Sequence, residues 1–302
     1  MPAVDLTEMA ERLKKEWFYQ YMLAPQKFSP NTVMPSFWPR GIAVRKDIEG
    51  SAEDQIEALW QYLLDGRQAP MPHGVVREPL RIVATEEAQM LRRSYPGIGK
   101  RGIGVGYPGR VNVAFDAEQL RLHALWKGDF ADPGGVWTGQ GHGNVRPLGQ
   151  PIEFGKGPDL DDQQQPWVVD EGRPPQHQFL GYTLDDRQRP TFRYRFAGVE
   201  VQDYFREVSD ETNQRTHLRR TVLFTASEGR QHLRFRLASA DRIVQQDQAY
   251  AVGDRLKLRI LTQQPPQIVD NGNDGQCLEM HFDLASGQSL EGVVDYQWES
   301  QQ

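Results

Sequence analysis

The feature that most constrains this chain is an alternation of apolar and polar residues that recurs from about residue 78 to the end. Successive side chains of a β-strand point to opposite faces, so a period of two marks strands that bury one face. Many such stretches, separated by Gly, Pro, Asn and Asp, predict antiparallel sheets packed face to face as a sandwich. The clearest stretches are residues 111–115, 192–196, 233–237, 256–260 and 278–282.

The first 70 residues follow a different period. Apolar residues at three- and four-residue spacing predict an amphipathic helix over residues 5–23, closed by Pro25. A second helix is expected over residues 51–64, with Ser51 as its N-cap. Residues 67–79 contain three prolines and a glycine and predict a linker.

These patterns predict an α+β chain with two domains. A partial all-α segment occupies residues 1–70, and a large antiparallel β-sandwich domain occupies residues 78–302. The Pro-, Asp- and Gln-rich run over residues 155–175 is either a long loop within the sandwich or a further boundary.

Composition excludes several classes of protein. No window of about 18 apolar residues exists, so we expect no transmembrane segment, and the N-terminus lacks the apolar core of a signal peptide. The net charge is −6 with both signs interspersed, which argues against a nucleic-acid partner. The single cysteine, Cys277, permits no disulfide and no cysteine-ligated zinc or iron–sulfur site, and is expected to be a small core residue.

One methionine stands out in the loop over residues 28–39. Met34 is followed by Pro35, Phe37 and Trp38, and a thioether held by prolines and aromatics suits the axial position of a haem iron. The helix, Met-Pro loop and helix of residues 5–64 resemble the C-terminal half of a class I c-type cytochrome domain. The resemblance implies that Met34 binds the iron of haem c, with Pro35, Phe37 and Trp38 around it. From spacing alone, Met34 is equally an apolar loop residue that fills a gap.

The haem-attachment motif Cys-x-x-Cys-His is absent from the chain. We expect either a fragment of a longer protein whose upstream part carries that motif, or a descendant of a cytochrome that no longer binds haem.

Residues 104–141 carry glycines, aromatics and aspartates in a recurring order: Val105-Gly106, Pro108-Gly109, Asn112, Ala114-Phe115-Asp116, Trp126, Gly128, Phe130, Asp132, Trp137, Gly139 and Gly141. Residues 181–194 add Gly-Tyr-Thr-Leu-Asp and Pro-Thr-Phe-Arg-Tyr, with Gln188 or Arg189 where glycine is usual. Both stretches resemble a segment found after cytochrome c domains in large multidomain exported proteins of planctomycetes. The resemblance implies an electron-transfer module in the periplasm or at the cell surface, serving a partner dehydrogenase that oxidises a sugar or an alcohol.

A second hypothesis is an extracellular carbohydrate-binding or scaffolding sandwich without a redox role, and a third is a polysaccharide hydrolase or lyase. We expect no catalysis in this chain itself. Aromatic and carboxylate side chains suit the faces and hydroxyls of sugars, so Asp116, Trp126, Trp137 and His142 are the candidate ligand-binding residues. The same residue types are also explained by turns and by a core.

Gly104, Gly106 and Gly109 fit the letters of a dinucleotide-binding fingerprint. That fingerprint needs a helix after the glycines, whereas residues 110–115 alternate as a strand. The sequence therefore argues against nucleotide binding.

Overall fold

The computed structural model describes residues 5–70, 80–138, 141–162, 176–210, 215–262, 264–272 and 275–298. The chain forms two compact units, Met1–Glu78 and Pro79–Gln302. Residues 71–79, in the expected linker, and residues 163–175, in the Pro-, Asp- and Gln-rich run, lie outside the described part.

The expected fold class is wrong. Strands make up 47% and helices 17% of the structure, so the chain is mainly β rather than an α+β combination with an all-α cytochrome segment. The physical reason is that, apart from one short helix, the described helices lie within residues 6–68, whereas strands between residues 89 and 298 build the much larger second core. None of the described helices has the length and apolar character needed to cross a bilayer.

Unit Met1–Glu78 contains short helices around two longer ones. The elements are η1 (Leu6–Glu8), α1 (Met9–Arg12), α2 (Lys15–Leu23), α3 (Pro25–Phe28), η2 (Pro39–Gly41), α4 (Ala52–Asp65) and η3 (Gly66–Gln68). The helix expected over residues 5–23 is interrupted, because Leu13 and Lys14 are extended between α1 and α2.

The helix expected from Ser51 is confirmed as α4. The Ser51 hydroxyl accepts from the Asp54 N–H at 3.2 Å, and the Asp54 carboxylate accepts from the Ser51 N–H at 2.8 Å. This capping box satisfies two backbone donors at the start of the helix. Ile56 and Trp60 of α4 then pack with Phe18 and Trp38 to form the small core of this unit.

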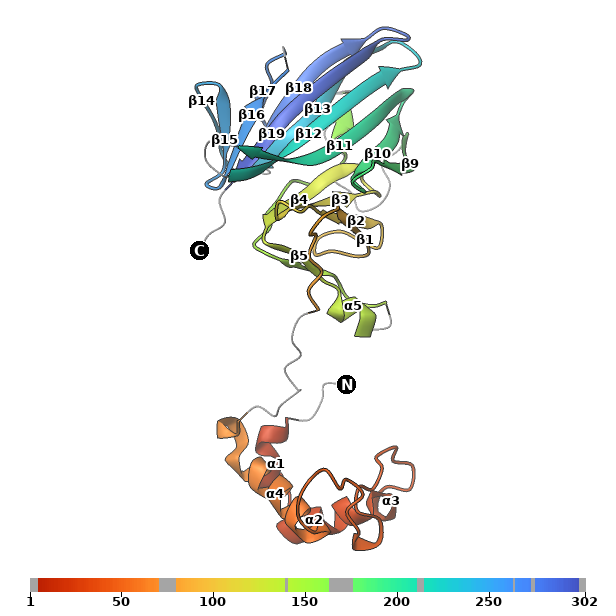
Figure 1. Ribbon diagram of the computed structural model, residues 1–302, viewed down its shortest axis with the longest axis vertical. Helices are drawn as coiled ribbons and strands as arrows, with labels where there is room; N and C mark the ends of the chain where they lie inside the picture. The colour runs from red at the N-terminus through yellow and green to blue at the C-terminus, as the bar shows by residue number, and fades with distance from the viewer. Residues whose placement is uncertain are drawn as a thin grey trace. The chain divides into compact units, whose positions relative to one another are not determined.

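Unit Pro79–Gln302 is built on an eight-stranded antiparallel sheet (Figure 1). Its order is β14 (Ile243–Gln246), β15 (Ala249–Val252), β16 (Leu256–Ile260), β19 (Ser289–Trp298), β12 (Arg215–Ala226), β11 (Val199–Asp210), β10 (Pro190–Phe196) and β9 (His177–Leu184).

Three further sheets complete the unit. A five-stranded sheet has the order β1 (Gln89–Arg92), β2 (Gly102–Gly106), β3 (Val111–Asp116), β4 (Arg121–Lys127) and β7 (Ile152–Glu153). A four-stranded sheet has the order β17 (Gln267–Asp270), β18 (Gln276–Leu284), β13 (Arg230–Ala240) and β8 (Leu160–Asp161). A small ribbon pairs β5 (Asp129–Asp132) with β6 (Arg146–Leu148), and helix α5 (Gly134–Thr138) lies between them in sequence.

The five alternating stretches of the sequence all lie in strands, namely β3, β10, β13, β16 and β18, so these strand predictions are confirmed. One face of the eight-stranded sheet packs on both larger neighbours. Phe192 stacks on Phe115 of the five-stranded sheet with ring centroids 4.4 Å apart. Phe224 lies 4.7 Å from Phe282 of the four-stranded sheet. The core therefore lies between one broad sheet and two narrower ones.

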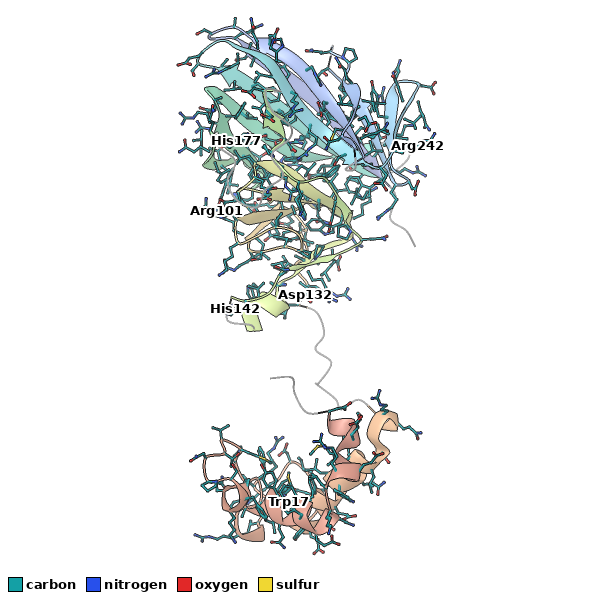
Figure 2. The ribbon with its side chains drawn as sticks, turned by 180° about the vertical axis from the view of Figure 1, so that it is seen from behind. Trp17, Arg101, Asp132, His142, His177 and Arg242 are labelled. Carbon is teal, nitrogen blue, oxygen red and sulfur yellow. The ribbon has the colours of Figure 1, made fainter. Side chains whose placement is uncertain are left out.

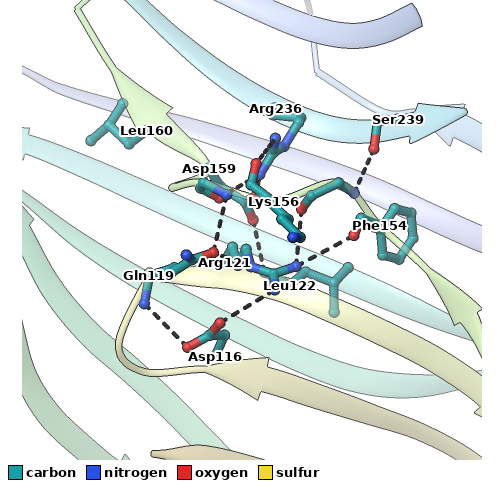
Figure 3. A network of polar contacts seen from close by, with 12 residues as sticks. Asp116, Gln119, Arg121, Leu122, Phe154, Lys156, Asp159, Leu160, Arg236 and Ser239 are labelled. Carbon is teal, nitrogen blue, oxygen red and sulfur yellow. Dashed lines mark hydrogen bonds and ion pairs between the residues drawn. The ribbon is translucent and has the colours of Figure 1, made fainter. Parts of the chain in front are cut away.

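A buried polar network joins these three sheets (Figure 3). Asp159 accepts from the Leu122 N–H of β4 and from Arg220 of β12, both at 2.9 Å. It also forms an ion pair of 3.4 Å with Arg236 of β13. Buried charges are tolerated when each is paired and hydrogen-bonded, so the network fixes where the sheets meet.

Candidate functional site

The expected haem-binding loop forms an ordinary loop with its own hydrogen bonds. Met34 is half-buried, its N–H donates to Thr32 Oγ1 at 3.2 Å, and its carbonyl accepts from Gln26 at 3.1 Å. Pro35 is exposed and Phe37 is 44% exposed. Trp38 is buried, and its indole N–H donates to Gln55 Oε1 at 2.8 Å. Trp38 therefore serves the packing of this unit.

A groove of about 720 Å³ lies beside this loop. Trp38, Leu59 and Tyr62 are among the side chains that line it, and Met34 is not. The methionine sulfur therefore does not belong to the wall of the groove in this unit.

The expectation of a metal-binding cytochrome is wrong for the part of the chain that the structure describes, while electron transfer itself stays a prediction. Within the described ranges, no group of three or more His, Cys, Asp or Glu could hold a metal ion. Residues 5–70 contain neither histidine nor cysteine, so this unit offers no strong ligand to face Met34 across a haem. Cys277 is 1% exposed and packs in the β core.

Two of the four candidate ligand-binding residues are buried and satisfied. The Asp116 carboxylate accepts from the N–H groups of Glu118 and Gln119 and pairs with Arg121 at 3.3 Å, which holds the turn between β3 and β4 (Figure 3). Trp126 is 0% exposed and donates its indole N–H to the Phe130 carbonyl at 2.9 Å. Because neither side chain reaches solvent, neither offers a surface to a sugar.

The other two candidates lie on one exposed projection. Trp137 of α5 is 55% exposed, and His142 follows a few residues later, also exposed (Figure 2). The Gly141 N–H donates to the Val136 carbonyl and folds this loop back on α5. The structure thus separates Trp137 and His142 from the buried pair Asp116 and Trp126, and the four do not form one site.

The glycines of the rejected fingerprint have a packing role. A Cβ on Gly104 would lie 2.0 Å from the Tyr95 hydroxyl, and one on Gly106 would lie 2.5 Å from the Phe130 ring. Strand β2 needs glycine at these two positions because the Tyr95 and Phe130 side chains pack directly against its backbone. Strand β3 follows it, so no helix N-terminus is available for a phosphate.

A group of charged and polar side chains lies on the face of the eight-stranded sheet that points away from the core, which we call the outer face. Alternation places Phe205, Leu218 and Arg220 on the inner face, and each is 0% exposed. The neighbouring positions therefore point outward. They include Arg206 on β11, His217 and Arg219 on β12, Asp295 on β19, and Lys257 and Arg259 on β16.

Four of these residues form a single row across four adjacent strands. The register pairs Arg206 with Arg219, Arg219 with Asp295, and Asp295 with Arg259. We call these four residues the arginine row. At its centre, Arg219 donates to both oxygens of Asp295, at 2.6 and 2.9 Å. Such a two-point ion pair holds both side chains in one orientation.

The centre of the row is further fixed by His217. Its Nε2 lies 3.3 Å from Asp295 Oδ2. Burial opposes ionisation of this carboxyl group, but the hydrogen bonds from Arg219 and His217 outweigh burial and lower the pKa of Asp295 to about 2. Asp295 is therefore an ionised, oriented acceptor at neutral pH.

A second oriented cluster lies beside the row. The hydroxyl of Tyr204 donates to Asp185 at 2.9 Å, and Arg189 donates to the same carboxylate oxygen at 2.8 Å. The Arg189 guanidinium also lies over the Tyr204 ring at 5.6 Å. Tyr204 and Arg206 share the outer face because they are two residues apart on β11. The face thus presents donors, acceptors and an aromatic ring together.

Sequence reasoning missed the outer face as a site. The signal that was present is the set of cationic residues at polar positions of alternating strands, such as Lys257 and Arg259. In the sequence, these residues look like any solvent-exposed position of a half-buried strand.

Comparison with family models found no match, and comparison with curated proteins found none. Among solved structures, the chain is similar to a protein described as a kojibiose phosphorylase from the human microbiome, with 10% identity, a TM-score of 0.31, and coverage of 71% of this chain and 29% of the other. It is also similar to heparan sulfate lyase HepC from Pedobacter heparinus, with 10% identity, a TM-score of 0.28, and coverage of 96% and 43%. A mutant of that lyase matches with 11% identity and a TM-score of 0.30. The chain spans less than half the length of each of these structures.

Proposed function

We propose that this protein is a carbohydrate-binding β-sandwich whose recognition surface is the outer face of the eight-stranded sheet. The observation that carries the proposal is the arginine row, in which the buried Asp295 holds the partly exposed Arg219 in a fixed orientation in line with Arg206 and Arg259.

The chemistry of sugars fits this surface. A sugar hydroxyl both donates and accepts hydrogen bonds, so a protein binds it best with a hydrogen-bond donor and an acceptor placed side by side. The Tyr204 hydroxyl beside the partly buried Asp185 supplies this arrangement, and Arg219, oriented by the buried Asp295, adds guanidinium donors. Because both pairs are already oriented by their own hydrogen bonds, binding costs little additional side-chain entropy.

The resemblance of residues 104–194 to a segment of exported planctomycete proteins supports a location outside the cytoplasm, where polysaccharides are met. Trp137 and His142 are exposed and remain candidates for contact with the same or another part of a glycan.

The proposal is tested by affinity electrophoresis of the full chain in gels containing a panel of plant, algal and animal polysaccharides. We expect retardation by at least one polysaccharide, and a loss of about tenfold or more in affinity for Arg219→Ala, because that variant also releases Asp295.

The matched control is Arg101→Ala. Arg101 is also paired with a carboxylate, Glu118 at 2.6 Å, but that pair lies by the five-stranded sheet. Equal affinity of wild type and Arg219→Ala would remove the outer face from the site. No retardation by any polysaccharide would refute the proposed function.

A further inference from the structure

The arginine row carries more positive charge than its own carboxylate can neutralise. Asp295 is paired with Arg219. No carboxylate among the described residues forms an ion pair with Arg206, Lys257 or Arg259, which all lie on the same face. The chain as a whole has a net charge of −6, so this local excess of cations is opposite in sign to the overall charge.

From this charge pattern we infer that the ligand is a polysaccharide with acidic groups along its length, a uronate or a sulfated glycan. The inference rests on the proposed function and narrows it to one class of carbohydrate. Guanidinium groups bind carboxylates and sulfates through two parallel hydrogen bonds, which explains the use of arginine at both ends of the row.

The spacing of the cations favours a polymer over a single small anion. Adjacent strands lie about 4.8 Å apart, so Arg206 and Arg259, on the first and fourth strands of the row, are about 14 Å apart along it. One carboxylate or sulfate cannot bridge that distance. A chain of sugars that crosses the strands can place an acidic group at each end and hydroxyls over the partly exposed Arg219 between them.

The carboxylates on the same face argue against a nucleic acid. Asp295 and Glu200 point outward and are ion-paired acceptors. Duplex DNA carries one phosphate charge per about 1.7 Å of axis and would meet these acceptors at close range. An acidic polysaccharide separates its charges by whole sugar rings and leaves hydroxyls to donate to them.

The experiment compares matched polymers against the full chain by isothermal titration calorimetry. The probes are polygalacturonate and alginate, each with its carboxyl-reduced counterpart, chondroitin sulfate with its desulfated counterpart, and duplex DNA. We expect at least one acidic polymer to bind about tenfold or more tightly than its neutralised counterpart. Raising salt from about 50 mM to about 300 mM should weaken binding of the acidic polymer only.

The double variant Arg206→Ala/Arg259→Ala should lose the preference, so that it binds the acidic polymer no more tightly than the neutralised one. Arg101→Ala should keep both affinities, and far-ultraviolet circular dichroism checks that each variant is folded. Equal binding of an acidic polymer and its neutralised counterpart would overturn the inference and leave the proposed function standing. Absence of binding to every polysaccharide would overturn both the inference and the proposed function. Tighter binding to duplex DNA than to any polysaccharide would identify the ligand as a nucleic acid.

Discussion

Arg220 and Asp203 form an ion pair with both side chains completely removed from solvent. Arg220 donates from Nε and Nη2 to the two Asp203 oxygens, at 2.9 and 2.6 Å, and each side chain is 0% exposed. Removing one member of such a pair leaves an uncompensated buried charge.

We therefore expect Asp203→Ala to lower the free energy of unfolding of the β unit by about 3–5 kcal/mol. Urea unfolding of the full chain, followed by tryptophan fluorescence and circular dichroism, measures this change. The control is Asp186→Ala, an exposed aspartate, which should change stability by less than about 0.5 kcal/mol. Similar effects of the two substitutions would show that the pair contributes no special stability.

The stability of the β unit should depend on Asp295 in acid. The pKa of Asp295 is lowered to about 2, against about 3.9 in an unfolded chain. A lowered pKa means that the contribution is fully present above the unfolded-state pKa and is lost as the pH falls toward 2. Since Arg219 is partly exposed, we discount the pKa shift for solvent screening and expect a contribution of about 1–2 kcal/mol.

Asp295→Asn removes this pH-dependent contribution. The difference in unfolding free energy between wild type and Asp295→Asn should therefore shrink by about 1–2 kcal/mol between pH 5 and pH 2, measured as urea midpoints. Asp254→Asn, at an exposed aspartate, provides the control. A constant difference across this range would show that Asp295 is not held ionised by Arg219 and His217.

The thiol of Cys277 should be unreactive in the folded protein. Burial raises its pKa to about 11, and the side chain is 1% exposed. At pH 8 the thiolate fraction is then about 100-fold lower than for a free cysteine. Modification by Ellman's reagent should be negligible without denaturant and complete after unfolding in urea. Rapid modification of the native protein would contradict a closed core between β17, β18 and β13.

Strand β2 should not tolerate a methyl group at Gly106. A Cβ there would lie 2.5 Å from Cγ of the Phe130 ring, so the ring must move. Overpacking of this kind costs about 1–3 kcal/mol. We expect Gly106→Ala to lower the unfolding midpoint accordingly. Gly99→Ala is the matched control, because no atom lies within 4 Å of its added Cβ; an equal effect of both would exclude ring contact as the cause.

Local patterns predicted the local structure well. The alternation in residues 192–196 marks β10 because one face of that strand is buried. Ser51 and Asp54 identify the start of α4 because a capping box depends only on residues three apart. The break at Leu13 and Lys14 was missed because the apolar spacing continues through it.

The haem prediction failed because the residues around Met34 were assigned to a haem site, although a structural role without haem can explain them. Trp38 is required by its hydrogen bond to Gln55 and by its contacts in the small core. Packing thus explains Trp38 without a haem, whereas Pro35 and Phe37 are exposed.

The outer face could not be predicted from sequence because it depends on register between distant strands. Arg219 and Asp295 are 76 residues apart, and only the pairing of β12 with β19 brings them together. Each strand pattern shows which residues face outward, but it does not show which strands are neighbours.

Asp159 connects parts of the chain that lie on both sides of residues 163–175, so it would hold the protein together after cleavage of the backbone there. A break anywhere in residues 163–175 would leave Asp159 and Leu122 on one fragment and Arg220 and Arg236 on the other. The stacked rings of Phe115 and Phe192 would also be shared between the fragments. The two pieces would therefore remain together as a non-covalent complex and copurify, until urea or loss of the aspartate charge released them.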